Sequence, residues 1–466
     1  MDWLECTEIL FSQLERTNRL DSEFYKKKSL EIVKLLQAIK ATSLTNYVNV
    51  SDGNHMGISE KFIEKGIPYY RGQDIHSFFI EDANPICIDE NTYNIPYMHR
   101  SHLKKGDILL SIVGTIGEVA FVSKDEKATC NCKLAILRPN DIENSALIGI
   151  YLKTKYGFDQ VDKFKRGAVQ MGYLLEDMDQ ILIPEFSDNF AKRISKVIED
   201  VKVLTDRSNK QYLNAQKCLL KEISIDMSAI TNGGVSIKSF ADSFGTSGRL
   251  DAEYYQPKYD KFETHVLHYP NGYTTPSREF KLIKTKCDRA LKDYPYVEIG
   301  NIDIGTGTAE YNVLPTNELP ANAKIMTRKG DLLVSTVRPY RGAVSILDED
   351  DLLVSGAFTV LRENGTYPAQ TLQVLFRTSL YKDWLLKYNV GTSYPVIKDD
   401  DVLNIPIPIL ADKIHKKIKE MVKQSRELLN IAKALLNCAK QAVEMAIETN
   451  EETAISWLES QKSKGS

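Results

Sequence analysis

Three short stretches set arginine, lysine and glutamine beside aromatic and glycine residues. They are "YYRGQDIHS" (69–77), "KFKRGAVQ" (163–170) and "TVRPYRG" (336–342). Arginine and glutamine can each form two hydrogen bonds to a guanine or an adenine, and lysine and arginine neutralise phosphates. The chemistry open to them is nucleic-acid recognition; the alternative is that each is a solvated surface turn. The candidate contact residues are Arg71, Gln73, His76, Lys165, Arg166, Gln170, Arg338, Tyr340 and Arg341.

Motifs for catalysis do not accompany these stretches. "NIPY" (94–97) has isoleucine in place of the first proline of a methyltransferase tetrapeptide, and no glycine-rich cofactor loop precedes it. A Gly-Lys-Ser/Thr phosphate-binding loop is also missing, which excludes an ATP motor. Two carboxylate pairs, Asp21 with Glu23 and Asp251 with Glu253, are better explained as ion pairs or helix starts. We therefore expect neither catalytic residues nor, with scattered histidines and cysteines, a metal site.

The elements that position the stretches occur twice. "KGDILLSIV" (105–113) and "KGDLLVSTV" (329–337) match at six of nine positions, 224 residues apart. The shift stays constant downstream and drifts slightly upstream, where "RLDSEFY" (19–25) corresponds to "RLDAEYY" (249–255). A period this long indicates a duplicated domain and not a solenoid.

Each repeat reads as a mixed α/β domain with a strand-rich middle. The segments "GDILLSIV", "EVAFVS" and "KLAILRP" of the first copy, and "DLLVSTV", "GAVSIL" and "FTVLRE" of the second, are short apolar runs separated by glycine, aspartate, asparagine and proline. Such runs predict β-strands. The predicted fold class is α/β (α+β), with two repeated strand-rich domains.

A long helix is expected after each repeat. From Phe190 and from Ile414, apolar or small residues recur at alternating steps of four and three, which is a heptad pattern. We expect the two helices to pair as an antiparallel coiled coil with pseudo-twofold symmetry, holding the repeats at opposite ends of a rod. The spacer and partner-binding positions predicted on this seam are Ile194, Val197, Val201, Leu204, Ile418, Met421, Leu428 and Leu435.

These boundaries predict five segments. They are a first domain (1–186), a first helix with its linker (187–228), a second domain (229–410), a second helix (411–450) and a C-terminal tail (451–466). The composition, 42% hydrophobic and 26% charged with a net charge of −3, is that of a globular protein without a basic excess. No apolar run suits a membrane span or signal peptide, so we expect a cytoplasmic location and reduced cysteines.

The order domain, helix, domain, helix, with "RLD.E.Y" and "KGD.L.S" in each half and the closing segments "ILIPEF" (181–186) and "IPIPIL" (405–410), resembles the specificity subunit of Type I restriction-modification systems. In that family each repeat is a target recognition domain that reads one half of a split DNA sequence. The helices set the gap and dock two methyltransferase subunits, and motor-nuclease subunits join for cleavage. The resemblance implies a non-catalytic subunit with no cofactor of its own, S-adenosylmethionine being bound by the methyltransferase.

The resemblance also directs attention to loops that differ between the repeats. "GTIGE" (114–118) stands where the second copy has "RPYRG" (338–342), which adds Thr115 to the candidate DNA contacts. "GTSYPVI" (391–397) keeps a polar loop close to the family's form and adds Thr392, Ser393 and Tyr394. Two alternatives remain open: a specificity subunit of a related two-subunit or methylation-only system, and a coiled-coil assembly scaffold.

Overall fold

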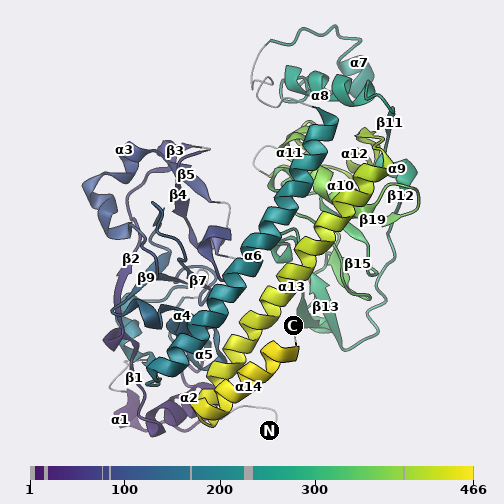
Figure 1. Cartoon of the computed structure of the whole chain (residues 1–466). Coiled ribbons are helices and arrows are strands. Elements are labelled where there is room, and N and C mark those ends of the chain that lie inside the picture. Colours follow the sequence, from purple (N-terminus) through teal and green to yellow (C-terminus); the bar gives the residue numbers. More distant parts are fainter. Residues whose placement is uncertain are drawn as a thin grey trace. The chain divides into compact units, whose positions relative to one another are not determined.

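Two copies of one strand arrangement fill most of the chain in the computed structural model (Figure 1). The structure describes residues 6–14, 19–63, 65–75, 77–82, 85–167, 171–224, 235–391 and 394–464. The chain divides into unit 1, Met1–Thr205 with Leu429–Ser466, and unit 2, Asp206–Leu428. Each unit contains one repeat and parts of both long helices. The duplicated mixed α/β fold predicted from the sequence is therefore confirmed.

Unit 1 begins with two helices and continues through ten strands interrupted by three further helices. Its elements are α1 (Phe11–Leu14), α2 (Lys27–Ala38), β1 (Thr42–Ser43), β2 (Val48–Asp52), β3 (Phe62–Ile63), β4 (Ile67–Tyr70), β5 (Ile86–Ile88), α3 (Glu90–Tyr93), β6 (Ile108–Ser111), β7 (Val119–Phe121), β8 (Thr129–Cys130), β9 (Leu134–Pro139), α4 (Ser145–Lys153), α5 (Lys155–Lys163) and β10 (Leu182–Ile183). One sheet has the order β2-β9-β6-β7 and is antiparallel throughout. A second has the order β3-β5-β4-β8, in which β4 and β8 are parallel.

Unit 2 repeats this plan. Its elements are α7 (Phe244–Ser247), α8 (Pro257–Leu267), β11 (Tyr273–Thr274), α9 (Pro276–Glu279), β12 (Phe280–Leu282), β13 (Asp293–Val297), β14 (Asn312–Pro315), β15 (Ala323–Met326), β16 (Leu332–Ser335), β17 (Val344–Ile346), β18 (Leu353–Ser355), β19 (Phe358–Glu363), α10 (Ala369–Phe376), α11 (Ser379–Leu386), α12 (Asp399–Asn404) and β20 (Ile407–Pro408). The sheet β12-β19-β16-β17 matches β2-β9-β6-β7 strand for strand. In the other sheet, β14-β13-β18 matches β5-β4-β8, and the outer strand differs. The six strand segments predicted from apolar runs are β6, β7, β9, β16, β17 and β19.

The phrase "KGD" owes its repetition to a buried ion pair at the start of a central strand. In unit 1 the Asp107 carboxylate accepts from Arg138 Nε at 2.8 Å and Nη2 at 2.7 Å, and in unit 2 Asp331 accepts from Arg362 at 2.7 Å twice. Both aspartates are almost fully buried, and each also accepts a backbone N–H. The preceding glycine has a positive φ in both copies, +91° and +89°, which favours glycine. The repeated phrase is therefore part of the framework.

Two long helices follow the repeats, as predicted: α6 (Asp188–Ile223) and α13 (Asp412–Glu448), followed by α14 (Glu451–Lys464). In unit 1 the first half of α6 shares a core with the second half of α13, and in unit 2 the second half of α6 shares a core with the first half of α13. This pairing is antiparallel in each unit. Ser208 and Ser425 meet within unit 2, where each hydroxyl donates to the other residue's carbonyl oxygen, at 2.7 and 2.9 Å.

The buried face of the helices departs from the predicted heptad. Of the predicted seam positions, Ile194, Val197, Val201 and Ile418 are buried, whereas Leu204, Met421, Leu428 and Leu435 are only half-buried. In α6 one line of buried positions runs the length of the helix, with Ala191 and Ile198 buried beside it; the line consists of Phe190, Ile194, Val197, Val201, Thr205, Ser208, Tyr212, Ala215, Leu219 and Ile223. Their mean spacing is about 3.7 residues, nearer to the 3.6 of a straight helix than to the 3.5 of a supercoil. Polar Thr205 and Ser208 lie on this buried face. The predicted heptad selects Leu204 in place of Thr205, so it departs from the buried face there.

Several smaller expectations can be compared with the described residues. All seven cysteines are free thiols in the structure. Among the described residues, no group of three or more His, Cys, Asp or Glu side chains is arranged so that it could hold a metal ion, and no helix is both long enough and apolar enough to cross a membrane. Residues 225–234, which span the predicted boundary between the first linker and the second domain, lie outside the described residues. The five-segment division itself remains a prediction.

Candidate nucleic-acid interface

Two loops of unit 2 are tied together beside the edge of the β16–β17 hairpin. One follows β16 and contains Arg338, and the other follows α11 and contains Tyr394. Val337 and Val396 form an isolated antiparallel bridge. The Arg338 N–H donates to the Pro395 carbonyl at 2.8 Å, and the Ile397 N–H donates to the Thr336 carbonyl at 2.9 Å. This bridge and its two hydrogen bonds, called the loop tie below, bring the predicted segments 336–342 and 391–397 together in one surface.

Unit 1 has the same tie at the same shift of 224 residues. Val113 bridges Gly172, the Gly114 N–H donates to Met171 at 3.0 Å, and the Tyr173 N–H donates to Ile112 at 2.8 Å. Because backbone atoms make these bonds, the side chains at the loop tips can change without loss of the tie. The structure thus separates a shared backbone scaffold from side chains that differ between units.

In unit 2 the loop tips present two arginines and two tyrosines. The Arg338 guanidinium lies 4.4 Å from the centroid of the Tyr394 ring, a cation–π distance. Tyr340 and Tyr394 remain 40% and 55% exposed. Arg341 is exposed, and no carboxylate of the described residues pairs with it or with Arg338. These two guanidinium groups are available to an acceptor outside the chain.

The loop that carries the arginines is held in an unusual backbone conformation. Arg338 has φ +50°, a left-handed conformation that costs a non-glycine residue about 1–2 kcal/mol. The short 3-10 turn Pro339–Arg341 follows and ends at Gly342, whose φ is +73°. A β-carbon on Gly342 would lie 2.8 Å from the Lys382 side chain. The turn thereby fixes the direction of Arg338 and Arg341 relative to α11.

The corresponding tip in unit 1 carries no arginine. Gly114 and Thr115 occupy its exposed end, between β6 and β7. Gly114 has φ +89° and stands where unit 2 has Arg338. The equivalent tips of the two units therefore offer different hydrogen-bonding groups on the same backbone path.

Arg71 and Gln73 lie in a tight turn after β4. Arg71 is engaged within the chain, since its Nε and Nη2 donate to the Asp74 carboxylate at 2.9 and 3.0 Å. That bond uses the forked face with which an arginine would bind a guanine. Gln73 is exposed in the same turn. In unit 2 the equivalent turn is closed by Asn301, whose side chain accepts the Glu298 N–H at 2.9 Å.

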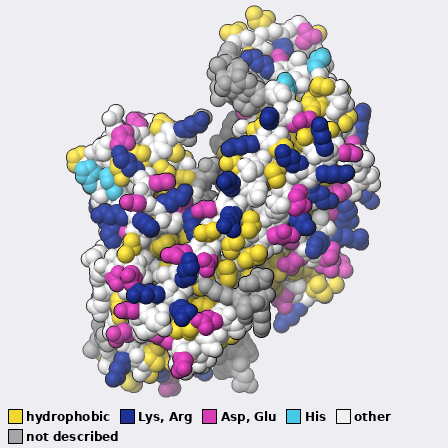
Figure 2. Space-filling model, in the orientation of Figure 1, with side chains coloured by type: hydrophobic (Ala, Val, Ile, Leu, Met, Phe, Trp, Pro, Cys, Tyr) yellow, Lys and Arg dark blue, Asp and Glu magenta, His cyan; other side chains and the backbone are white. Residues whose placement is uncertain are grey.

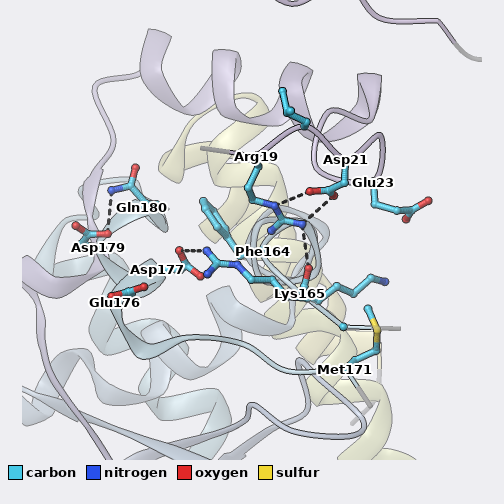
Figure 3. A pocket seen from close by; sticks show the side chains of 13 residues that line it. Arg19, Asp21, Glu23, Phe164, Lys165, Met171, Glu176, Asp177, Asp179 and Gln180 are labelled. Carbon is cyan, nitrogen blue, oxygen red and sulfur yellow. Dashed lines mark hydrogen bonds and ion pairs between the residues drawn. The ribbon is translucent and has the colours of Figure 1, made fainter. Parts of the chain in front are cut away.

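Lys165 and Arg166 also form ion pairs within unit 1, beside a cavity of about 1260 Å³ (Figure 3). Lys165 Nζ lies 2.6 Å from Asp162 and Arg166 Nη2 lies 2.7 Å from Asp177. Burial raises the pKa of the Asp177 carboxyl above its ordinary value. His76, Gln170, Thr392 and Ser393 lie outside the described residues. Contact of any of the candidate residues with DNA remains a prediction.

The sequence interpretation overlooked some residues that position these loops. Arg19 pairs with Asp21 and also donates to the Lys165 carbonyl at 3.2 Å, holding the segment after α5. Arg249 holds the equivalent segment of unit 2 through the Asn389 carbonyl at 2.8 Å. The bond from Arg19 keeps the pKa of Asp21 below its ordinary value. The sequence shows that "RLD" recurs, and the ion pair expected there is confirmed. The hydrogen bond from each arginine to a distant loop could not be predicted from the sequence.

Basic and acidic side chains are mixed on the visible face, as expected from the nearly balanced composition. Lys and Arg side chains alternate with Asp and Glu over both units (Figure 2). A continuous basic band is not seen on that face.

Comparison with known proteins agrees with this architecture. No family model matches the chain. The chain is 24% identical over 332 residues to the "Type I restriction enzyme MjaVIII specificity subunit" of Methanocaldococcus jannaschii, covering 69% of this chain and 72% of that protein. Among solved structures, the Type I S subunit from M. genitalium (14% identity, TM-score 0.37, 89% of this chain and 94% of that chain) and the HsdS subunit from Thermoanaerobacter tengcongensis (13%, 0.26, 89% and 95%) are similar. The curated relative, which spans most of both chains, confirms the resemblance seen in the paired motifs: over most of its length this chain is similar in sequence to a Type I restriction enzyme specificity subunit.

Proposed function

We propose that this chain is the non-catalytic DNA-recognition subunit of a Type I restriction-modification complex. Each repeat reads one half of a bipartite target. The observation that carries this proposal is the pair of equivalent loop ties, Val113 to Gly172 and Val337 to Val396, which support different side chains at the same place. A chain that reads two unlike half-sites with one duplicated fold needs this division.

In unit 2 the reading groups are Arg338 and Arg341, with Tyr394 orienting the first. A guanidinium stacked on an aromatic ring keeps its edge N–H groups free, and these can donate two hydrogen bonds to guanine in the major groove. Tyr340 lies beside them and offers apolar contact or a hydroxyl. In unit 1 the exposed Thr115 and Gln73 take the reading role. Arg71 supports the Gln73 turn through Asp74.

The helices α6 and α13 serve as spacer and as docking surface. Each runs without a break through residues of both units, over 36 and 37 residues. Half-buried Leu204, Met421, Leu428 and Leu435 border the shared helical core and leave apolar surface at its margin. One methyltransferase subunit docks on each half, and motor-nuclease subunits join where the complex cleaves DNA. The methyltransferase supplies S-adenosylmethionine and the chemistry of methyl transfer.

Reconstitution with the methyltransferase encoded beside this chain tests the proposal. The purified chain alone should methylate no DNA. The co-expressed complex should methylate DNA and show two methyltransferase subunits per chain in native mass spectrometry. Robust methylation by the chain alone, or a chain that never associates with the methyltransferase, would contradict the proposal.

A further inference from the structure

The turn that opens each repeat presents the same exposed leucine in both units. Leu20 is 83% exposed in unit 1 and Leu250 is 66% exposed in unit 2. Each lies between an arginine and an aspartate that pair with one another, at 2.8 Å in unit 1 and 2.6 Å in unit 2. An exposed leucine contributes little to the core, so its presence at both places needs another explanation.

The turn around each leucine is internally fixed. The Tyr25 hydroxyl donates to the Arg19 carbonyl at 3.0 Å, and the Tyr255 hydroxyl donates to the Arg249 carbonyl at 3.1 Å. Both arginines also stack on the neighbouring aromatic ring, at 4.6 and 4.7 Å from its centroid. The polar groups of the turn are thus used within the chain, while the leucine is held outward on a rigid support. A preorganised apolar side chain is the usual anchor of a protein interface.

The surroundings of Leu20 are acidic. The cavity that it lines with Arg19, Lys165 and Arg166 also contains five carboxylates, so that acidic groups outnumber basic ones (Figure 3). Asp177, 8% exposed, lines it too, and its second carboxylate oxygen finds no hydrogen-bond partner among the described residues. Such a lining repels a phosphate backbone and attracts a cationic side chain.

Unit 2 has acidic residues at the equivalent positions of the sequence. Asp401 stands at the position of Asp177, with Asp400 next to it. Burial raises the pKa of the Asp401 carboxyl, as it does for Asp177, and Arg249 is among the charges that act on it. The leucine, the arginine and aspartate that flank it, and the Asp177 or Asp401 carboxylate recur in both units, although Gly167 and Met171, from a loop that differs between the units, also line the cavity beside Leu20. A ligand for the leucine turns is therefore common to both halves, which a half-site of DNA is not.

We propose that Leu20 and Leu250 are twin docking points for a basic, apolar segment of the partner methyltransferase, one copy on each half. This rests on the proposed function and adds a contact surface distinct from the long helices. An apolar side chain of the partner packs on the leucine, and a neighbouring lysine or arginine reaches the carboxylates, of which Glu176 and Asp179 are exposed in unit 1.

Variants of the full chain, titrated with the methyltransferase, test this inference. Leu20→Asp should weaken one of two binding sites by about 10- to 100-fold, since burial of one leucine is lost, and leave the other unchanged. Leu250→Asp should do the same at the other site, and the double variant should weaken both. Glu176→Lys with Asp179→Lys should weaken only the unit 1 site.

Exposed apolar residues elsewhere supply the controls. Ile142→Asp and Leu291→Asp alter side chains that are 59% and 61% exposed, one in each unit, and should leave both affinities unchanged. Thermal unfolding checks that every variant folds, and Leu20→Ala with Leu250→Ala replaces any aspartate variant that does not. Unchanged affinities in the folded double variant would overturn the inference while leaving the proposed function intact. Failure of the wild-type chain to bind the methyltransferase would overturn both.

Discussion

Gly114 and Arg338 occupy equivalent places in the two units, and both have a left-handed backbone, with φ +89° and +50°. Each donates its N–H across the loop tie, Gly114 to Met171 at 3.0 Å and Arg338 to Pro395 at 2.8 Å. Glycine adopts this conformation freely, whereas arginine does not. Unit 2 therefore has a strained arginine where unit 1 has an unstrained glycine, and strain of this kind is often kept at binding sites.

This relationship predicts different effects for two substitutions at one position. Arg338→Gly should be more stable than Arg338→Ala by about 1 kcal/mol, because only glycine relieves the left-handed strain. Both should lose recognition equally, since both lack the guanidinium. Urea unfolding combined with a methylation assay measures the two effects. Equal stabilities would show that the loop relaxes around alanine and stores no strain.

The buried ion pairs of the two units should be separately important for stability. Arg362→Ala leaves Asp331 buried without its charged partner and should destabilise unit 2 by about 2–4 kcal/mol. This loss is somewhat smaller than for a fully buried ion pair because Arg362 is one-third exposed. Arg138→Ala should do the same to unit 1. Arg341→Ala, which removes an exposed side chain, is the matched control. A loss below about 0.5 kcal/mol in Arg362→Ala, within the range of ordinary surface substitutions, would contradict a framework role for the pair.

Stability should decrease on mild acidification because of a half-buried histidine, His415. Burial lowers the pKa of His415, whose Nδ1 lies 3.0 Å from the Thr371 hydroxyl. The unfolded chain therefore takes up the proton first, at about pH 6.5, and the free energy of unfolding falls from there down to the folded pKa. His415→Gln should reduce this fall. Urea unfolding between pH 7 and pH 5 is the measurement, and an unaltered pH dependence in the variant would refute the assignment.

The strands and the duplication could be predicted because they rest on residues that recur at one spacing. Gly106, Asp107 and Arg138 reappear 224 residues later, since both copies need the same turn and the same buried pair. The use of Arg71 could not be predicted in this way. Its partner Asp74 lies three residues on, and the turn geometry decides whether the guanidinium faces that carboxylate or the solvent.

The helix seam shows a second limit of sequence patterns. Leu204 and Thr205 are neighbours, and an apolar pattern selects the leucine, yet the threonine is the more buried. Its hydroxyl donates to the Val201 carbonyl at 2.9 Å, which lets a polar residue lie in the core. The cost of burying such a residue depends on a hydrogen bond along the helix, which periodicity does not reveal.

The spacer role predicts a change in the gap of the target. Four residues inserted near Lys202–Ser208, matched by four near Arg426–Ala432, add about 6 Å of rise and about 40° of rotation beyond a full turn. One base pair adds about 3.4 Å and about 34°. We expect the unread gap to lengthen by one base pair, or two, with both half-sites retained. An unchanged gap would show that the helices do not set the spacing.

The central claim, that each repeat reads its own half of a split target, is tested most directly by sequencing modified bases in the genome of a host that expresses this chain with its methyltransferase. The wild-type chain should give two short elements separated by a fixed gap. Arg338→Ala with Arg341→Ala should relax one element, each lost contact costing about 1–3 kcal/mol, and leave the other unchanged. Gln73→Ala should affect the opposite element. A single contiguous target, or relaxation of both elements by the arginine variant, would contradict the account.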